Sequence, residues 1–129
     1  MKMREEADLW WRQALEDLRS AEANLTIERY YLVAFLCHQA VEKALKALHI
    51  QKLRESPGAT HSLVLLGRRV GAPSSLFGNL RKLGPDFVVA RYPNAAHGLP
   101  HELYDREMAE ERLRLAREVL DWVEREMRR

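Results

Sequence analysis

Residues 30–48 read YYLVAFLCHQAVEKALKAL and contain the pattern that decides the fold. Along this stretch, side chains that suit a protein core recur at alternating steps of three and four, as they do on one face of an α-helix. The positions of this stripe are Tyr31, Ala34, His38, Val41, Leu45 and Leu48. A second face carries the small residues Ala40, Ala44 and Ala47, where another helix can approach closely. The stretch therefore predicts a long helix that packs on two sides.

Two more stretches show the same spacing, one near each end of the sequence. Their apolar positions are Ala7, Trp11, Ala14, Leu18, Ala21 and Leu25 in the first, and Ala109, Leu113, Ala116, Leu120, Val123 and Met127 in the second. Asp105 stands just before the second stretch, where its carboxylate can accept hydrogen bonds from the free amides of a helix start. The pattern thus predicts three long helices, the last of them capped by Asp105.

The remaining segment, between the second and third long helices, is divided by turn residues. Proline and glycine occur at 57–58, 71–73 and 84–85, which leaves room for one or two short helices. No segment shows a sustained alternation of β-branched and aromatic residues of the kind that predicts strands. We therefore expect an all-α fold, an up-and-down antiparallel helical bundle of four to five helices, with residues 1–129 forming a single domain.

Length and composition exclude several classes of protein. The 129 residues are 47% hydrophobic and 31% charged, a balance typical of one globular domain. Cys37 is the only cysteine, so an internal disulfide and a thiolate zinc site are ruled out. His97 and His101 are four residues apart but lack a third ligand at suitable spacing, so we predict no metal site and no cofactor. Without a long apolar run or a signal-like start, we expect a cytoplasmic protein that does not enter a membrane.

Charge is unevenly distributed along the chain, although the net charge is only +2. Residues 43–91 contain 9 Lys and Arg against 2 Asp and Glu, whereas the segments on both sides are acidic. This basic middle predicts a face that binds anions or nucleic acid, with Lys43 and Lys46 on one helix flank as the first candidates. The alternative is a solvated flank on which Glu42 and the two lysines form ion pairs with one another.

Four separated blocks of the sequence resemble one protein family. They are residues 30–35 (YYLVAF), 39–47 (QAVEKALKA), 60–63 (THSL) and 91–93 (RYP). Together they are similar to the HEPN domain of prokaryotes and higher eukaryotes over about residues 7–126. The resemblance implies a helical bundle that dimerises, binds nucleotide or RNA, and is often encoded beside a small nucleotidyltransferase. It also implies two classes of activity, metal-independent ribonuclease toxins of two-gene systems and non-catalytic binding modules.

The ribonucleases of this family carry an Arg, four to six residues and a His at the start of the last long helix. Arg91 and His97, with five residues between them, match that spacing. The resemblance assigns His97 as the general base that takes the proton of a ribose 2′-hydroxyl, and Arg91 as the clamp on the phosphate. In the alternative, Arg91 bonds to carboxylates or carbonyls inside the bundle and His97 has no catalytic role.

His61 follows a Ser-Pro-Gly-Ala-Thr turn and is expected to open a short helix with Thr60 as its cap. The family has a His at this point, so His61 is a candidate nucleotide- or RNA-binding residue, although a His that bonds backbone at a helix start is the simpler explanation. We also expect a homodimer or higher homo-oligomer, because close helix approach at Ala40 and exposed aromatic residues near Trp10 and Tyr30 favour an interface. The rival function is a non-catalytic module that docks a nucleotidyltransferase partner.

Overall fold

The structure is a computed structural model that describes residues 3–129. Three long helices dominate it: α1 (Met3–Thr26), α2 (Tyr30–Leu53) and α8 (Arg106–Met127). The segment between α2 and α8 forms α3 (Leu63–Arg69), the 3-10 turn η1 (Ser74–Leu76), α4 (Phe77–Leu83), α5 (Asp86–Val89), α6 (Pro93–Ala96) and α7 (Pro100–Leu103). No strand occurs within residues 3–129, so the all-α prediction is confirmed. No helix among these residues is long and apolar enough to span a membrane.

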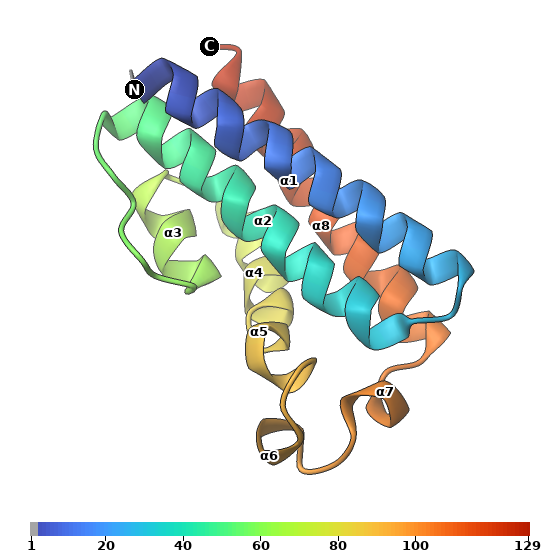
Figure 1. The fold of residues 1–129 in the computed structure, drawn as a ribbon. Coiled ribbons are helices and arrows are strands. Elements are labelled where there is room, and N and C mark those ends of the chain that lie inside the picture. The colour runs from blue at the N-terminus through green and yellow to red at the C-terminus, as the bar shows by residue number, and fades with distance from the viewer. Residues whose placement is uncertain (1–2) are drawn as a thin grey trace.

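The long helices lie side by side, and the short helices form a crossover that covers α2 (Figure 1). Helix α1 runs antiparallel to α2 and α8. Helices α2 and α8 point the same way, because the crossover returns the chain to the end of the bundle where α2 begins. Helix α2 contacts α1, α8, α3 and α5, so it is the central element. The two-sided packing predicted for residues 30–48 is therefore present.

The core confirms the predicted stripes. The fully buried side chains include Ala14 and Ala21 of α1, Val41, Leu45 and Leu48 of α2, and Leu113, Ala116 and Val123 of α8. Each buried Val or Leu side chain contributes about 1.5–3 kcal/mol by leaving water. The small-residue face of α2, made of Ala40, Ala44 and Ala47, is also fully buried inside the monomer. It therefore offers no surface to a second copy, and the reason that we gave for close approach between subunits is wrong.

Local signals set the starts of two helices, α8 and α3. The Asp105 carboxylate accepts a hydrogen bond from the Met108 amide at 2.8 Å, which confirms the predicted cap of α8. At α3 the cap is Ser62, whose hydroxyl accepts from the Leu65 amide at 3.2 Å. Thr60 was expected in that role, but its hydroxyl accepts from the Ser62 amide at 3.1 Å and so shapes the turn before the helix.

Helix α5 is attached to α8 by a buried polar cluster. The carboxylate of Asp86, the first residue of α5, is 2% exposed. It accepts hydrogen bonds from the Tyr104 hydroxyl at 2.6 Å and from Arg112 Nε at 2.7 Å. Burial, together with the bond to Asp86, raises the pKa of Tyr104 above its usual range. These bonds fix the position of α5, and with it the side chains of Phe87 and Arg91.

Candidate functional site

Arg91 stands at the centre of a group of aromatic rings where α5 meets α2. Its guanidinium carbon lies 4.7 Å from the ring centre of Phe35, 4.4 Å from that of Phe87 and 4.9 Å from that of Tyr92. At such distances an arginine is attracted to the negative faces of aromatic rings. Its Nε atom donates to the Phe87 carbonyl at 2.8 Å, one helical turn back. The guanidinium is thus held in place while the residue stays exposed.

The terminal nitrogens of Arg91 have no hydrogen bond or ion pair within the described part of the chain. In the alternative prediction, Arg91 bonds to carboxylates or carbonyls inside the bundle. The structure shows one such bond, to the Phe87 carbonyl, and no carboxylate among residues 3–129 lies within ion-pair distance of the guanidinium. An arginine with its fork of N–H groups open to solvent is suited to a planar or tetrahedral anion such as phosphate.

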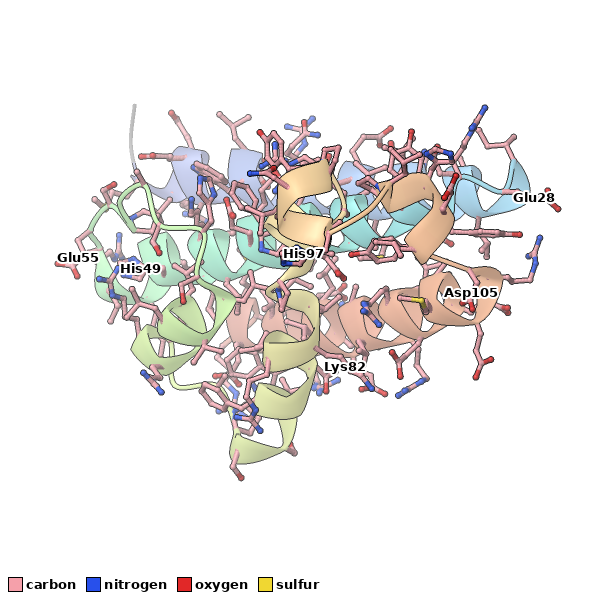
Figure 2. The ribbon with its side chains drawn as sticks, turned by 90° about the horizontal axis from the view of Figure 1, so that it is seen from below. Glu28, His49, Glu55, Lys82, His97 and Asp105 are labelled. Carbon is pink, nitrogen blue, oxygen red and sulfur yellow. The ribbon has the colours of Figure 1, made fainter. Side chains whose placement is uncertain are left out.

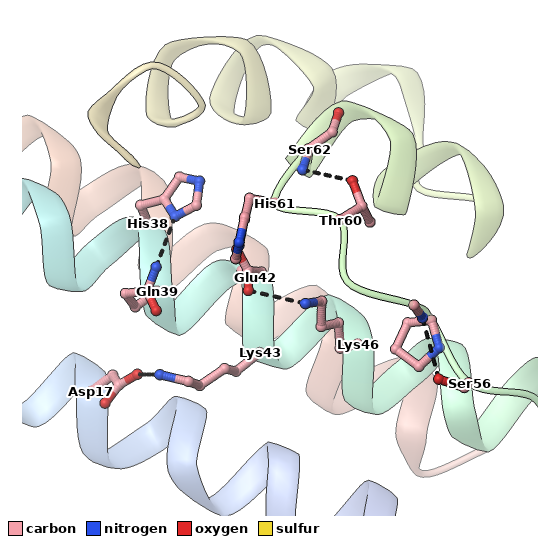
Figure 3. Close-up of polar contacts among 12 residues, drawn as sticks. Asp17, His38, Gln39, Glu42, Lys43, Lys46, Ser56, Thr60, His61 and Ser62 are labelled. Atoms are coloured by element: carbon pink, nitrogen blue, oxygen red, sulfur yellow. Dashed lines mark hydrogen bonds and ion pairs between the residues drawn. The ribbon is translucent and has the colours of Figure 1, made fainter. Parts of the chain in front are cut away.

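His61 lies next to this group and links it to a buried acid. Its ring stacks on Phe87 with 4.1 Å between centres, and its Nδ1 lies 2.8 Å from Glu42 Oε1 (Figure 3). The side chain of His61 is half exposed, so one edge of the imidazole faces solvent. His61 and Arg91 therefore contact the same aromatic ring, and the structure brings these two predicted site residues together.

Glu42 and Lys46 form a buried ion pair beneath His61. The Lys46 ammonium donates to Glu42 Oε2 at 3.1 Å, and each side chain is 5% exposed. Lys46 also lies 5.3 Å from the ring centre of Trp10 on α1, a cation–π contact that further shields the charge from water. Figure 3 shows the pair along α2, with His61 over Glu42. This is the internal pairing that we weighed as the alternative for the basic flank.

Lys43 is likewise occupied, because its ammonium donates to the Asp17 carboxylate of α1. The two lysines expected to bind anions therefore serve as ion-pair partners inside the chain, and Lys46 lies out of reach of solvent. Some exposed cations of the basic middle have no side-chain hydrogen bond or ion pair in residues 3–129, if the bond of Arg91 to backbone is set aside. All of them are arginines: Arg54, Arg68, Arg81 and Arg91. The unpaired exposed positive charge in this region is therefore presented by guanidinium groups and not by Lys43 or Lys46.

His38 extends the group into the core. Its ring centre is 5.3 Å from that of Phe87, and the residue is fully buried. Burial lowers the pKa of His38 to about 4, so the imidazole is neutral near pH 7. Its Nδ1 lies 3.4 Å from Gln39 Nε2, and its Nε2 has no partner in the described residues. His38 therefore acts as a neutral core side chain behind the site.

His97 lies apart from the start of α8. It follows α6 in the left-handed conformation, with φ 55° and ψ 39°, and lies on the crossover side of the bundle (Figure 2). The residue is exposed. The family pattern places this His at the start of the last long helix, but here α7 and a turn separate it from α8, which begins at Arg106. Its side chain makes no hydrogen bond within residues 3–129. Arg91 and His97 thus lie six positions apart in one short segment of the sequence, and both are exposed.

Sequence reasoning missed the aromatic partners of Arg91. Phe35 and Phe87 lie 52 positions apart in the sequence, and only the docking of α5 on α2 brings them to one guanidinium. Phe35 belongs to a block that resembles HEPN, which is the one signal that could have pointed to it.

Within residues 3–129 no three His, Cys, Asp or Glu side chains are grouped so as to hold a metal ion.

Comparisons with known proteins place this architecture in a family. Residues 7–126 match the model of the HEPN domain. The structure is similar to TT1696 from Thermus thermophilus, with a TM-score of 0.85 and 34% identity over 93% of this chain and 97% of that one. It is also similar to ST0689, an archaeal HEPN homologue, with a TM-score of 0.81 and 29% identity over 94% and 97% of the two chains. No curated protein matches the chain. The family match and the two folds agree with the resemblance in the sequence, and the chain is a member of the HEPN domain family.

Proposed function

We propose that this chain binds a nucleotide or RNA and that Arg91 is the residue that holds the phosphate. The observation that carries the proposal is the exposed guanidinium held on Phe35, Phe87 and Tyr92 with its terminal nitrogens unpaired in residues 3–129. A side chain already fixed in its binding conformation loses less rotamer entropy when a ligand arrives. Nucleotide and RNA binding is a general property of the family, which supports phosphate as the anion.

His61 is the second binding residue in this proposal. It stacks on Phe87 beside Arg91 and keeps one edge in solvent, so it can donate to a phosphate or a base. Glu42 orients His61 through the 2.8 Å contact at Nδ1, and Lys46 neutralises the charge of Glu42 from the buried side. Lys46 thus supports the site through Glu42 and does not contact the ligand, while Lys43 fixes α2 to α1 at Asp17.

Binding to a single-stranded RNA of mixed sequence tests this proposal. Arg91→Ala should weaken binding and reduce the slope of log affinity against log salt concentration by about 0.7, the value for one phosphate contact on a single strand. The matched control is Arg12→Ala on α1, which removes the same charge from an exposed i,i+4 pair with Asp8. If Arg91→Ala retains the affinity and salt slope of the wild type, the phosphate assignment is wrong.

A ribonuclease activity is the second candidate function, and the observation that favours it is the placement of Arg91 and His97 in one exposed segment. In this mechanism the His97 imidazole takes the proton of a ribose 2′-hydroxyl while Arg91 stabilises the charge that develops on the phosphate, as expected for a metal-independent toxin of a two-gene system. The test is cleavage of RNA in the presence of a chelator. His97→Ala should lower the rate about 10²–10⁴-fold, and DNA should resist because it lacks the 2′-hydroxyl.

RNA that stays intact with the wild-type protein would exclude the ribonuclease and leave binding as the function. If the wild-type protein neither binds nor cleaves RNA, the non-catalytic module that docks a nucleotidyltransferase is favoured.

For each of these functions we propose that the chain forms a homodimer or higher homo-oligomer, as HEPN domains commonly do. The supporting surface is the exposed apolar set on the crossover, Val88, Tyr92, Leu99 and Leu103. A monomer in sedimentation at tens of micromolar would contradict this assembly.

A further inference from the structure

An open groove of about 350 Å³ lies beside the proposed phosphate site, between the start of α3 and the end of α4. This volume is near the lower end of the range for small-molecule sites, about 300–1,000 Å³, and suits one base with its sugar. The residues that matter for the argument are His61, Val64, Leu80, Arg81 and Pro85, all of which line the groove. Val64 and Pro85 offer apolar surface in the groove, with the fully buried Leu80 behind them, and such surface suits the flat face of a nucleobase.

The groove is connected to Arg91 through His61. The imidazole lines the groove and also stacks on Phe87, whose ring lies 4.4 Å from the Arg91 guanidinium carbon. His61 therefore borders both the groove and the ring that carries the Arg91 guanidinium. This shared side chain links the groove to the proposed phosphate site.

Arg81 supplies a second cation on this surface. It is exposed, lines the groove, and has no hydrogen bond or ion pair in the chain from residue 3 onward. Its neighbour Lys82 is different, because the Lys82 ammonium donates to Glu111 at 3.0 Å. Of the two adjacent cations on α4, only Arg81 has its charge available to an anion.

We propose that the groove holds a nucleobase of a single-stranded RNA, with one backbone phosphate at Arg91 and another at Arg81. The inference rests on the proposed function of Arg91 and specifies its ligand. Arg81 and Arg91 each have an unpaired guanidinium group, and His61 lies between the groove and the aromatic rings. Two such cations suit a strand with more than one phosphate better than a nucleoside monophosphate. A base that stacks on apolar side chains and phosphates that meet cations are the usual elements of single-strand binding.

The test measures the affinity of a single-stranded RNA about ten nucleotides long at several salt concentrations. Arg81→Ala should bind several-fold more weakly than the wild type, with a salt slope that is smaller by about 0.7. Lys82→Ala is the matched control, since it removes the same charge one residue along α4 and should leave the slope unchanged. Uridine monophosphate should bind equally to the wild type and Arg81→Ala, because Arg91 alone would hold its phosphate.

A second measurement locates the base directly. The same RNA carrying 4-thiouridine should crosslink to peptides that contain residues 61–64 or 80–85, mapped by mass spectrometry. Crosslinks only elsewhere, or equal behaviour of Arg81→Ala and Lys82→Ala, would overturn the groove proposal while leaving the function of Arg91 intact. If Arg91→Ala instead binds RNA like the wild type, the proposed function itself fails, so the two failures are distinguishable.

Discussion

Replacing Glu42 by leucine removes one partner of an ion pair that water barely reaches. The side chains of Glu42 and Lys46 are each 5% exposed, so solvent screening reduces their interaction little. Glu42→Leu leaves the ammonium of Lys46 buried without a carboxylate, and breaking a buried pair in this way costs about 3–5 kcal/mol. The contact of Glu42 with His61 adds little to this loss, because the His61 side chain is half exposed.

The size of this loss can be compared with the stability of the whole domain. The free energy of unfolding of a domain is about 5–15 kcal/mol, so the Glu42→Leu variant should still fold but with a clearly lower free energy of unfolding. With a urea dependence of about 1–3 kcal/mol per M, the midpoint of unfolding should fall by roughly 2 M. The double variant Glu42→Leu/Lys46→Met removes both charges and should lie within about 1 kcal/mol of the wild type.

Urea titration followed by tryptophan fluorescence measures both variants, and Trp10 lies against Lys46 where it reports on this region. Circular dichroism at zero urea checks that each variant is helical. A midpoint for Glu42→Leu close to that of the wild type would mean that the pair is hydrated in solution. A double variant as unstable as Glu42→Leu alone would mean that the loss comes from packing and not from an unpaired charge. Either result would refute the reasoning.

Three further substitutions test other contacts. Asp105→Ala should lower the free energy of unfolding by about 1 kcal/mol through loss of the α8 cap, measured by urea titration against Asp105→Ser as the cap-retaining control. Burial lowers the pKa of His38 to about 4, whereas in the unfolded chain this side chain takes up a proton near pH 6.5. As pH falls from about 6.5 to 4, only the unfolded state gains this proton, so the free energy of unfolding should drop by about 3 kcal/mol. Thermal unfolding across this pH range should show a flatter profile for His38→Gln, and an equal slope would contradict the assignment. Gly67→Ala places a Cβ 2.5 Å from Leu80 Cδ1, so we expect a loss of about 1–3 kcal/mol in chemical unfolding, whereas Gly78→Ala, with open space, should be neutral or stabilising.

Local features of the sequence predicted the helical framework. The stripes of α1, α2 and α8 repeat every three to four residues, and a helix that carries such a stripe can bury it only against another element. The Asp105 cap was predicted for the same reason, since a cap depends on residues three positions apart. The blocks that resemble HEPN pointed to the family, and the match over residues 7–126 confirmed it.

The use of each polar side chain was less predictable. Lys46 stands on a flank of α2 that periodicity alone leaves open to solvent, yet it is buried, with Trp10 of α1 against its ammonium. The small face of α2 was expected to serve a partner but is filled by the chain itself. Periodicity gives the direction of a side chain from its own helix, but not which other element lies in that direction.

The sequence by itself determined that the chain is α-helical with a basic middle, because helix period, capping and charge are properties of nearby residues. Its four separated blocks also resembled the HEPN family, to which the match over residues 7–126 assigns it. Only the tertiary structure decided which cations face solvent and which are paired inside. Arg91 depends on Phe35 from α2 and Phe87 from α5, and His61 depends on Glu42 nineteen positions earlier. These contacts form when the crossover docks on α2, and that docking is set by the summed packing of distant segments rather than by any local pattern.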